Sequence, residues 1–391
     1  MRILHIINFF QPVLGYQETF LARTQSSNGH SVRVLTSDRY SNRLFRGGAS
    51  RQLLGKRLKG IGLSIEEGVE VERLPVTFEV LGSVWLRGLE KAITDFKPDA
   101  VHIHGLLSIN TVRVLRLKKH LMNMRVILDD HMTYNATRGW WVKPFYVMFR
   151  ILFMNLILRN ADGLVAVTEE TRDFMMNMYG IPFERIKIIP LGCDAAGLQR
   201  DERLRREIRN DYGIQEDEVV FCYVGKIIPE KGVDILVEAS IALMNSGERI
   251  RVFCVGGRDA KYLERLNNRI GQSGQTQKFI LLPAVPNKEL YRIYSIADVG
   301  VWPKQCSITM LEAMACELPV IISDGSGATE RVQGRGNGLI YHEGDIGDLE
   351  VKMKALMHSQ ARESMGRTAR LVAESCDWKS ISAEFERLYS T

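Results

Sequence analysis

Short apolar runs alternate with longer amphipathic segments along nearly the whole chain. Strand-type runs in the first half are RILHII, SVRVLTS, VEVERLP, DAVHIHG and RVILDD, and those in the second half are EVVFCYVG, IRVFCVGG, KFILLPAV, ADVGV and LPVIIS. Helix-type segments separate most of these runs, and such alternation builds parallel sheets covered by helices on both faces. The pattern predicts an α/β protein with two doubly wound, Rossmann-like domains that face each other across a cleft.

The length of 391 residues exceeds what one ordinary hydrophobic core accommodates, and it favours two domains. Between about Ala196 and Gly213 the composition becomes charged and helix-forming, which favours a linker into a second domain. We predict an N-terminal domain over residues 1–195 and a C-terminal domain over residues 196–370. Two further helices follow, separated near Cys376 and Trp378.

Composition narrows the function classes. A net charge of +6 suits a phosphate-bearing ligand or an anionic membrane surface, but it is too weak to indicate nucleic acid. The six cysteines form no C-x-x-C pair, which favours reduced thiols in a cytoplasmic protein and argues against a metal site. Neither a signal-peptide layout nor an apolar run long enough to span a membrane is present, so we expect a cytoplasmic protein.

The stretch from Trp302 to Ser323 carries the clearest chemical signal. A polar turn connects an apolar strand to the helical segment TMLEAMA, which has one carboxylate, Glu312, near its start. Free backbone N–H groups and the helix dipole both point at such a turn, so it can bind an anion. A phosphate-bearing ligand is the functional interpretation, and an ordinary βαβ unit with an incidental glutamate is the alternative.

Two segments could contact a surface or an acceptor. Residues 39–59 carry seven basic and no acidic residues, which is typical of a solvated loop or of a loop that binds anions such as lipid headgroups. Residues 139–158, GWWVKPFYVMFRILFMNLIL, are the most apolar part of the chain. They fit a core helix or a helix that lies partly in a membrane interface.

His102, His104 and His131 lie on or after predicted strands. His102 and His104 are two residues apart and face one side of a strand, which is compatible with a metal site. No third ligand is evident from the sequence, and structural histidines are the simpler interpretation. His131 follows the carboxyl end of its strand, where parallel sheets bind ligands.

Several segments in order along the chain resemble those of one family. FFQPVLGYQE, NGHSVRVLT, DAVHIHG, IIPLGCD, VGKIIPEKG and ADVGVWP followed by LEAMACELPVI are similar to the motifs of the retaining glycosyltransferases of GT-B fold that use nucleotide sugars. This is the large E-x7-E family, glycosyltransferase family 4 or glycosyl transferases group 1. The resemblance spans nearly the whole chain, and it implies that a final helix over residues 371–391 crosses back onto the first domain.

The resemblance also implies roles for individual residues. Lys226 and Lys231 would neutralise the diphosphate of the donor, and His131 would hydrogen-bond the donor sugar. The remaining donor-binding residues that it implies are Gly15, Val285, Ser307, Ile308, Thr309 and Glu312. Among these, Gly15 would let its loop approach the diphosphate or the acceptor, and the backbone near Val285 would meet the base. The N–H groups of residues 307–309 would bind the diphosphate, and Glu312 would bind the ribose hydroxyls.

One position departs from the family pattern. Lys304 stands where the first glutamate of E-x7-E, which binds the donor sugar, is usual. A lysine cannot accept a hydrogen bond, and it adds positive charge. Three explanations are open: a donor sugar with an anionic group, substitution by the neighbouring Gln305, or loss of activity.

The resemblance implies a hexosyltransferase that retains configuration and needs neither a metal nor another cofactor. The implied partners are a UDP- or GDP-sugar donor, a glycan or lipid-linked acceptor, and an anionic membrane surface at the inner face of the membrane. No G-x-G-x-x-G or D-x-D motif indicates a dinucleotide or a metal. A non-catalytic sugar-nucleotide-binding protein is the main alternative, because of Lys304, and an epimerase of the same fold is a weaker one.

Overall fold

The computed structural model describes residues 1–42, 53–80, 82–121, 123–134 and 142–390. The chain forms two compact units. The first is built on Met1–Arg43, Lys56–Leu191 and Trp378–Thr391, and the second on Gly192–Asp377. Each unit is a parallel sheet with helices against it, which is the predicted architecture.

The first unit has a sheet with the strand order β10-β9-β8-β7-β1-β2-β4-β3. Its pairs are parallel except for the edge pair of β3 and β4, which is antiparallel. The strands are β1 (Arg2–Ile6), β2 (Ser31–Ser37), β3 (Gly62–Glu66), β4 (Val69–Leu74), β7 (Ala100–His104), β8 (Arg125–Asp130), β9 (Gly163–Ala166) and β10 (Ile186–Ile188). A separate hairpin joins β5 (Val76–Val80) and β6 (Ser83–Leu86).

The second unit has an all-parallel sheet with the order β13-β12-β11-β14-β15-β16. Its strands are β11 (Val219–Val224), β12 (Ile250–Val255), β13 (Phe279–Leu282), β14 (Val299–Trp302), β15 (Val320–Ser323) and β16 (Gly338–Tyr341). Every residue of β11 is buried, because helices cover both faces of the sheet. This burial explains why VVFCYV is uninterrupted by polar residues.

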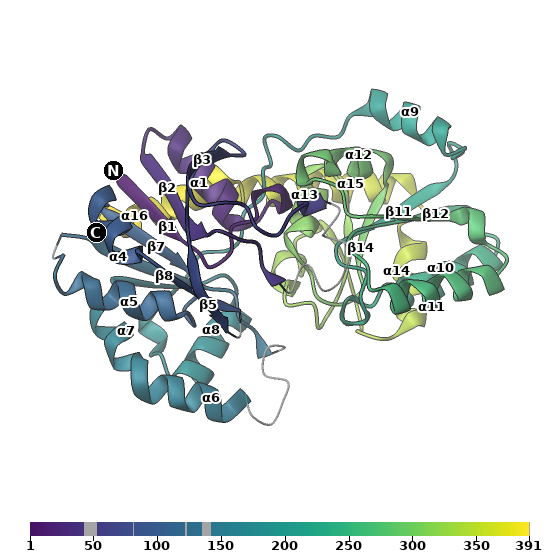
Figure 1. Ribbon diagram of the computed structural model, residues 1–391. Coiled ribbons are helices and arrows are strands. Elements are labelled where there is room, and N and C mark those ends of the chain that lie inside the picture. The colour runs from purple at the N-terminus through teal and green to yellow at the C-terminus, as the bar shows by residue number, and fades with distance from the viewer. Residues whose placement is uncertain (43–52, 81, 122, 135–141, 391) are drawn as a thin grey trace. The chain divides into compact units, whose positions relative to one another are not determined.

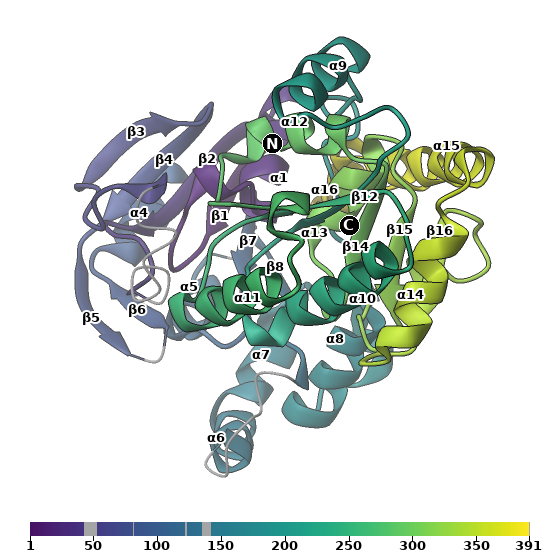
Figure 2. The same ribbon diagram turned by 90° about the vertical axis from the view of Figure 1, so that its right-hand side faces the viewer.

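Helices complete both layers. In the first unit they are α1 (Gln17–Ser27), α4 (Leu89–Phe96), α5 (Ile109–Lys118), α6 (Val142–Phe149), α7 (Asn155–Asn160) and α8 (Glu169–Phe174). In the second they are α9 (Glu202–Asp211), α10 (Val233–Asn245), α11 (Ala260–Gln272), α12 (Leu290–Ile296), α13 (Ile308–Ala315), α14 (Ile346–Ala355) and α15 (Ser359–Ser375). Figure 2 shows α14 beside α10, and the two helices are in contact.

The predicted linker over residues 196–213 is wrong for most of its length. The helix α9 belongs to the second unit, where it packs against α12. Arg205 and Arg209 both reach the carboxylate of Asp298, at 2.6 and 3.3 Å. The charged composition therefore reflects a helix anchored by ion pairs rather than an exposed connection.

The C-terminal helix α16 (Trp378–Ser390) belongs to the first unit. It packs against α1 and β8, and Figure 1 shows its yellow ribbon beside the purple N-terminal strands. The crossing segment begins at Trp378 rather than at residue 371, because α15 stays with α13 in the second unit. Trp378 stacks on Phe20 with ring centroids 5.6 Å apart, so an aromatic contact anchors the start of α16.

The apolar segment forms a nearly continuous helix in its described part. The helix α6 runs into a π-helical turn (Arg150–Met154) and then into α7. Residues 139–141, with both tryptophans, lie outside the described residues, as do residues 43–52 of the basic segment. No helix among the described residues is both long and apolar enough to cross a membrane.

Candidate functional site

Each sheet has a switch point, where the strand order reverses direction. In the second unit this point lies between β11 and β14, and in the first it lies between β1 and β7. Loops that leave the carboxyl ends of such neighbouring strands diverge and leave room for a ligand. The predicted site residues lie at or beside these two points, so each unit has a candidate site of its own.

The turn after β11 carries the two predicted lysines. The hydroxyl of Tyr223 donates to the carbonyl of Lys226 at 2.8 Å and fixes the start of this turn. Lys231 ends a short 3-10 helix, and Gly232 follows it with a left-handed φ of 67°. Burial lowers the pKa of Lys231, and the nearby charge of Lys226 lowers it further. Two ammonium groups that repel each other in this way favour an anion between or beside them.

Lys304 joins this cluster from the turn after β14. A Cβ atom on Gly232 would lie 2.9 Å from Cγ of Lys304, so the stem of this lysine packs against the glycine. The ammonium of Lys231 donates to the carbonyl of Gln305 at 3.1 Å. The backbone of Gln305 therefore connects the two turns, and a third positive charge stands where the family has a carboxylate.

The helix α13 begins at the same switch point. Ser307 is its N-cap residue, but the side chain of Ser307 does not cap the helix. Instead the hydroxyl of Ser307 pairs with that of Thr309 at 2.7 Å, and Thr309 donates to the carbonyl of Val224 at 2.7 Å. The first N–H groups of a helix have no partner in a preceding turn, so those of residues 307–309 remain suited to an anion.

Glu312 lies one turn further along α13 and is only 1% exposed. Asn287 donates to one of its carboxylate oxygens at 2.7 Å, and Tyr294 donates to the other at 3.1 Å. Burial raises the pKa of Glu312 to about 7, against the opposing effect of these two hydrogen bonds. The carboxyl group is therefore held rigidly, and its burial favours the protonated form.

Val285 lies between β13 and α12, near Asn287, which donates a hydrogen bond to Glu312. It is partly buried and packs against the core of the second unit. Asn287 follows two residues later, and its contact with Glu312 was missed by the sequence analysis. A polar residue just past the carboxyl end of β13 is the signal that could have identified it.

In the first unit, Gly15 ends a short 3-10 helix (Pro12–Leu14) that follows β1. It is buried and has a left-handed φ of 66°, a conformation that disfavours residues with a Cβ atom. The first turn of α1 then brings Glu18, which is 6% exposed. Burial raises the pKa of Glu18, although the nearby His104 and His131 favour its charged form.

His131 follows β8 and is 41% exposed at its side chain. Its Nε2 lies 3.6 Å from Oδ2 of the fully buried Asp129, and its backbone N–H donates to Asp130 at 2.8 Å. Burial opposes protonation of the imidazole, but the contact with Asp129 prevails and raises the pKa of His131. Asp129 is a site residue that the sequence analysis did not select.

A third histidine, His5, joins His102 and His104, and the sequence did not single it out. It pairs with His102 in the register of β1 and β7, and its Nδ1 lies 2.9 Å from Nε2 of His104. The three histidines therefore converge under α1 and α16. Five of the six ring nitrogens have hydrogen-bond partners among one another, Asp129, Gln25 and Tyr389, and the sixth, Nε2 of His102, lies 3.2 Å from Asp129 without a hydrogen bond.

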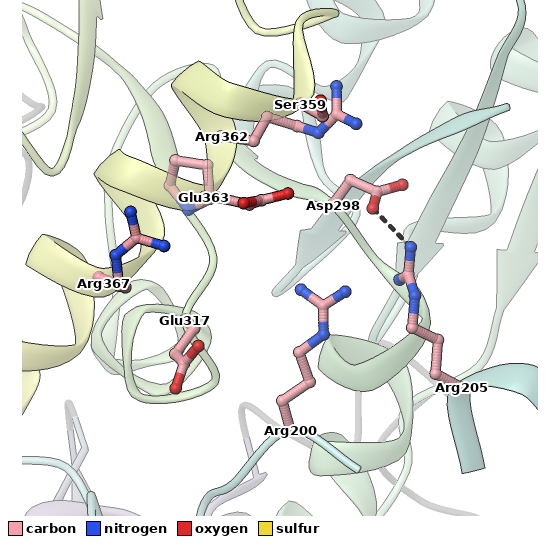
Figure 3. A pocket seen from close by; sticks show the side chains of 9 residues that line it. Arg200, Arg205, Asp298, Glu317, Ser359, Arg362, Glu363 and Arg367 are labelled. Carbon is pink, nitrogen blue, oxygen red and sulfur yellow. Dashed lines mark hydrogen bonds and ion pairs between the residues drawn. The ribbon is translucent and has the colours of Figure 1, made fainter. Parts of the chain in front are cut away.

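A cavity of about 290 Å³ lies elsewhere in the second unit. Figure 3 shows four arginines around it, together with carboxylates and Ser359; the lining residues are Arg200, Arg205, Asp298, Glu317, Pro319, Ser359, Arg362, Glu363 and Arg367. Arg205 donates to three backbone carbonyls and pairs with Asp298, and Arg362 donates to two carbonyls of the preceding segment. Because these cations already stabilise the protein's own backbone, a structural role explains this cavity. It contains no predicted site residue.

Comparison with known families identifies both halves of the chain. Residues 205–372 match the family described as "Glycosyl transferases group 1", and residues 19–192 match the "Glycosyl transferase 4-like domain". Between them, these two matches include most of the chain. The chain belongs to the family 4, group 1 glycosyltransferases, as the resemblance in its sequence implied.

Three curated relatives show the range of the family. The D-inositol 3-phosphate glycosyltransferase of Nocardia farcinica is 28% identical over 243 residues, which cover 60% of this chain and 53% of that protein. The GDP-mannose-dependent alpha-(1-6)-phosphatidylinositol monomannoside mannosyltransferase of Mycolicibacterium smegmatis is 26% identical, with 66% and 69% covered. The sulfoquinovosyl transferase of Arabidopsis thaliana is 23% identical, with 75% and 56% covered. The chain thus spans only 53% of the length of the first of these relatives.

Solved structures show the same fold over the whole chain. HepE of Anabaena, in complex with UDP and glucose, has a TM-score of 0.72 at 17% identity and covers 100% of both chains. Sucrose-phosphate synthase of Thermosynechococcus elongatus has a TM-score of 0.72 at 17% identity and covers 100% of this chain and 98% of that one. The predicted GT-B fold class is therefore confirmed.

The ionisation of Glu312 predicts a pH dependence of stability. Its pKa is about 7 in the folded protein against an ordinary 4.5, so between these values the folded chain holds a proton that the unfolded chain has released. The free energy of unfolding should therefore fall as the pH rises from 4.5 to 7, by up to about 3 kcal/mol from this group alone. Urea denaturation at several pH values should show a flatter profile for Glu312→Gln than for the wild type.

Glu289, an exposed glutamate at the start of α12, provides the matched control. Glu289→Gln should give a stability profile parallel to that of the wild type. Equal pH slopes for the wild type and Glu312→Gln would contradict the assignment of a protonated carboxyl group to this site.

Proposed function

We propose that this protein is a retaining glycosyltransferase that moves a hexose-type sugar from a nucleoside-diphosphate donor to a hydroxyl group of a lipid-linked or growing glycan. Its curated relatives are named as glycosyltransferases, and two of those names include an inositol phosphate or a phosphatidylinositol mannoside. HepE was crystallised with UDP and glucose, which supports a nucleotide-sugar donor.

The observation that carries this proposal is the meeting of Lys226, Lys231 and the start of α13 at one switch point. Two ammonium groups and a set of helical N–H groups suit the diphosphate of a sugar nucleotide. In the reaction the diphosphate leaves with additional negative charge, and fixed positive groups stabilise that charge in the transition state. Lysines in this place supply what a metal ion would otherwise supply, so the proposed reaction needs no metal or other cofactor.

Glu312 supports recognition of the nucleoside. Asn287 and Tyr294 occupy one lone pair on each carboxylate oxygen, and each oxygen can accept another hydrogen bond. Hydroxyl groups of a ribose would be suitable donors. On the side of the first unit, Gly15 and His131 end or follow strands at the equivalent edge, where the acceptor and the transferred sugar would bind.

A membrane-bound acceptor is supported by the surface of α6 and the π-helical turn. Val147, Met148, Ile151 and Leu152 are 56%, 51%, 74% and 58% exposed. They occur as two pairs four residues apart, so they share one face of the helix. The exposed Arg159 lies further along the same helix. An apolar stripe with basic residues is suited to an anionic membrane interface, at the inner face of the membrane for a cytoplasmic protein.

Lys304 favours a donor with an anionic sugar within this proposal. It places a third ammonium beside the diphosphate site, and it makes no hydrogen bond or ion pair within the described part of the chain. The relative in Arabidopsis is named a sulfoquinovosyl transferase, and this name refers to a sulfonated, anionic sugar. A second function is compatible with the same lysine: a sugar-nucleotide-binding protein without transferase activity.

Removal of a diphosphate-binding lysine tests the proposed function. Lys231→Ala should weaken the binding of UDP- or GDP-sugars by about 10- to 100-fold, because a charge-assisted hydrogen bond contributes about 1.5–3 kcal/mol. The measurement is isothermal titration calorimetry with the nucleotide sugar that raises the melting temperature most in a screen. Lys354→Ala, an exposed lysine on α14, is the matched control and should bind like the wild type. Unchanged affinity in Lys231→Ala would refute the diphosphate site.

Exchange of Lys304, which differs from the family pattern, distinguishes a glycosyltransferase from a protein that only binds sugar nucleotides. Lys304→Glu restores the family pattern and should reduce transfer from the native anionic donor, since a carboxylate repels the charged sugar. It should also favour neutral hexose donors. Sugar transfer and donor hydrolysis are the readouts. A wild-type protein that binds a nucleotide sugar but performs neither reaction is the binding protein of the alternative.

The apolar stripe predicts binding to anionic vesicles at low salt. The double variant Ile151→Ser with Leu152→Ser should reduce co-sedimentation with such vesicles by at least about tenfold, because two exposed apolar side chains lose their burial in lipid. Leu371→Ser, which alters a 66% exposed leucine on α15, is the control and should have no effect. Absence of wild-type binding at low salt would exclude a membrane-surface acceptor.

A further inference from the structure

Six side chains of the first unit form a closed cycle of polar contacts. In order they are Asp129, His104, His5, Gln25, Tyr389 and His102, and the last of these contacts Asp129 again. The six distances are 2.9, 2.9, 2.7, 3.2, 2.8 and 3.2 Å. The cycle links β1, β7 and β8 to the helices α1 and α16.

The cycle is buried except at His104, whose side chain is 5% exposed. His5, Gln25, His102 and Asp129 are each 0% exposed, and Tyr389 is 3% exposed. Water cannot supply missing donors or acceptors at such positions, so the groups must satisfy one another. Each of the six contacts then needs one hydrogen atom.

Counting these hydrogen atoms shows a deficit. The carboxylate of Asp129 contributes none, the hydroxyl of Tyr389 contributes one, and the amide of Gln25 contributes one whichever way it is turned. A neutral imidazole contributes one, so the three histidines contribute three. The total is five for six contacts. One of the imidazoles must therefore carry an additional proton to close the cycle.

The contact between His102 and Asp129 decides the count. Nε2 of His102 lies 3.2 Å from Oδ2 of Asp129 without forming a regular hydrogen bond, and it has no hydrogen-bond partner among the described residues. Without a proton this nitrogen would direct a buried lone pair at a carboxylate, which is unfavourable. With a proton, the nitrogen and the carboxylate attract each other, and the cycle is complete.

The electrostatics limit where this proton can lie. Burial and the nearby His104 and His102 lower the pKa of His5, and burial and His104 lower that of His102 to about 4, so neither of these two imidazoles carries the additional proton. Burial opposes ionisation of Asp129, but His104 and His102 hold its pKa well below the ordinary range. The other titratable groups that face the cycle are Glu18 on α1, Asp130 and His131 at the end of β8, and Glu386 on α16.

We propose that Asp129 is the positioning residue for His131, and that the cycle around it holds one proton at neutral pH to keep this carboxylate charged and fixed. Oδ2 of Asp129 accepts from Gln17 at 2.8 Å as well as from the cycle, and His131 approaches the same oxygen at 3.6 Å. The imidazole of His131 is therefore oriented from behind by a carboxylate that is held at Oδ2, while its Oδ1 has no hydrogen-bond partner among the described residues. The role of His131 toward a sugar rests on the proposed function, but the proton in the cycle does not.

The stored proton can be observed directly by ¹⁵N NMR of the histidine side chains. A doubly protonated imidazole gives two similar nitrogen shifts, and a neutral one gives two well-separated shifts. The chain has eight histidines, and an imidazole with the ordinary pKa is almost wholly neutral at pH 8. Nearby carboxylates raise the pKa of His131 and of His342. The wild type at pH 8 should show an imidazolium that persists in His131→Gln and in His342→Gln, which excludes these two histidines as its source.

Tyr389→Phe opens the cycle and should remove this imidazolium. Without the hydroxyl, the amide of Gln25 can turn and donate to His5, and three neutral histidines then satisfy every remaining contact. Tyr262→Phe is the matched control, because it removes a buried hydroxyl that bonds Asp234 in the second unit and leaves the cycle intact. Neutral histidines throughout the wild type, or an imidazolium unaffected by Tyr389→Phe, would overturn the proposal. Stoichiometric zinc in the purified protein would also overturn it, because the imidazoles would then be ligands.

Asp129→Asn tests the positioning of His131. Loss of the carboxylate should lower the pKa of His131, measured by NMR titration, by about one unit or more. In a transfer assay the same variant should lower kcat and leave the donor KM within about twofold, since the donor diphosphate binds elsewhere. An unchanged titration of His131 would refute the positioning role. If the wild type transfers no sugar, the NMR result still decides this role, and only the proposed function fails.

Discussion

Burial of both sheets on both faces is the constraint on which the rest of this structure depends. A strand such as β11, buried at every residue, cannot carry polar side chains along its length. Chemistry is therefore confined to the loops at the strand ends, and the reversal of strand order makes one position on each sheet roomier than the others. Lys226 and Lys231 of the second unit and the loop with Gly15 in the first unit lie at these positions. The end of β8, with Asp129 and His131, lies beside the loop with Gly15. Their placement follows from topology.

The two units differ in the sign of the charge that they place at these strand ends. The second gathers positive charge at the strand ends, where Lys226, Lys231 and Lys304 lie beside the start of a helix. The repulsion between Lys226 and Lys231 is a cost in the free protein that an anionic ligand would remove. The first unit instead buries a negative charge, Asp129, and surrounds it with hydrogen-bond donors. A buried charge of this kind is tolerated only when its partners are close and fully arranged.

The helix α16 connects these features to the architecture. Its Tyr389 completes the polar cycle, and Trp378 and Phe385 pack into the first unit. Residues near the end of this sequence thus contribute to the surroundings of His131, about a third of the way along it. The helix α16 therefore contributes to the surroundings of Asp129 and His131 as well as to the fold of the first unit.

Hydrophobic periodicity by itself determined the α/β class, the two domains and most strands, because alternation of buried strands with helices leaves few other arrangements. Motifs in the sequence also selected the lysine turn, the start of α13, Glu312, Gly15 and His131. The segment of β3, GLSIE, alternates apolar and polar positions as a strand does, but only the structure shows that Leu63 and Ile65 are exposed and that β3 pairs antiparallel with β4 at the edge of the sheet. The sequence could not place Lys304 against Gly232, or bring His5, Gln25 and Tyr389 together around Asp129. These contacts join residues up to 364 positions apart, and only the tertiary structure decides which distant side chains become neighbours.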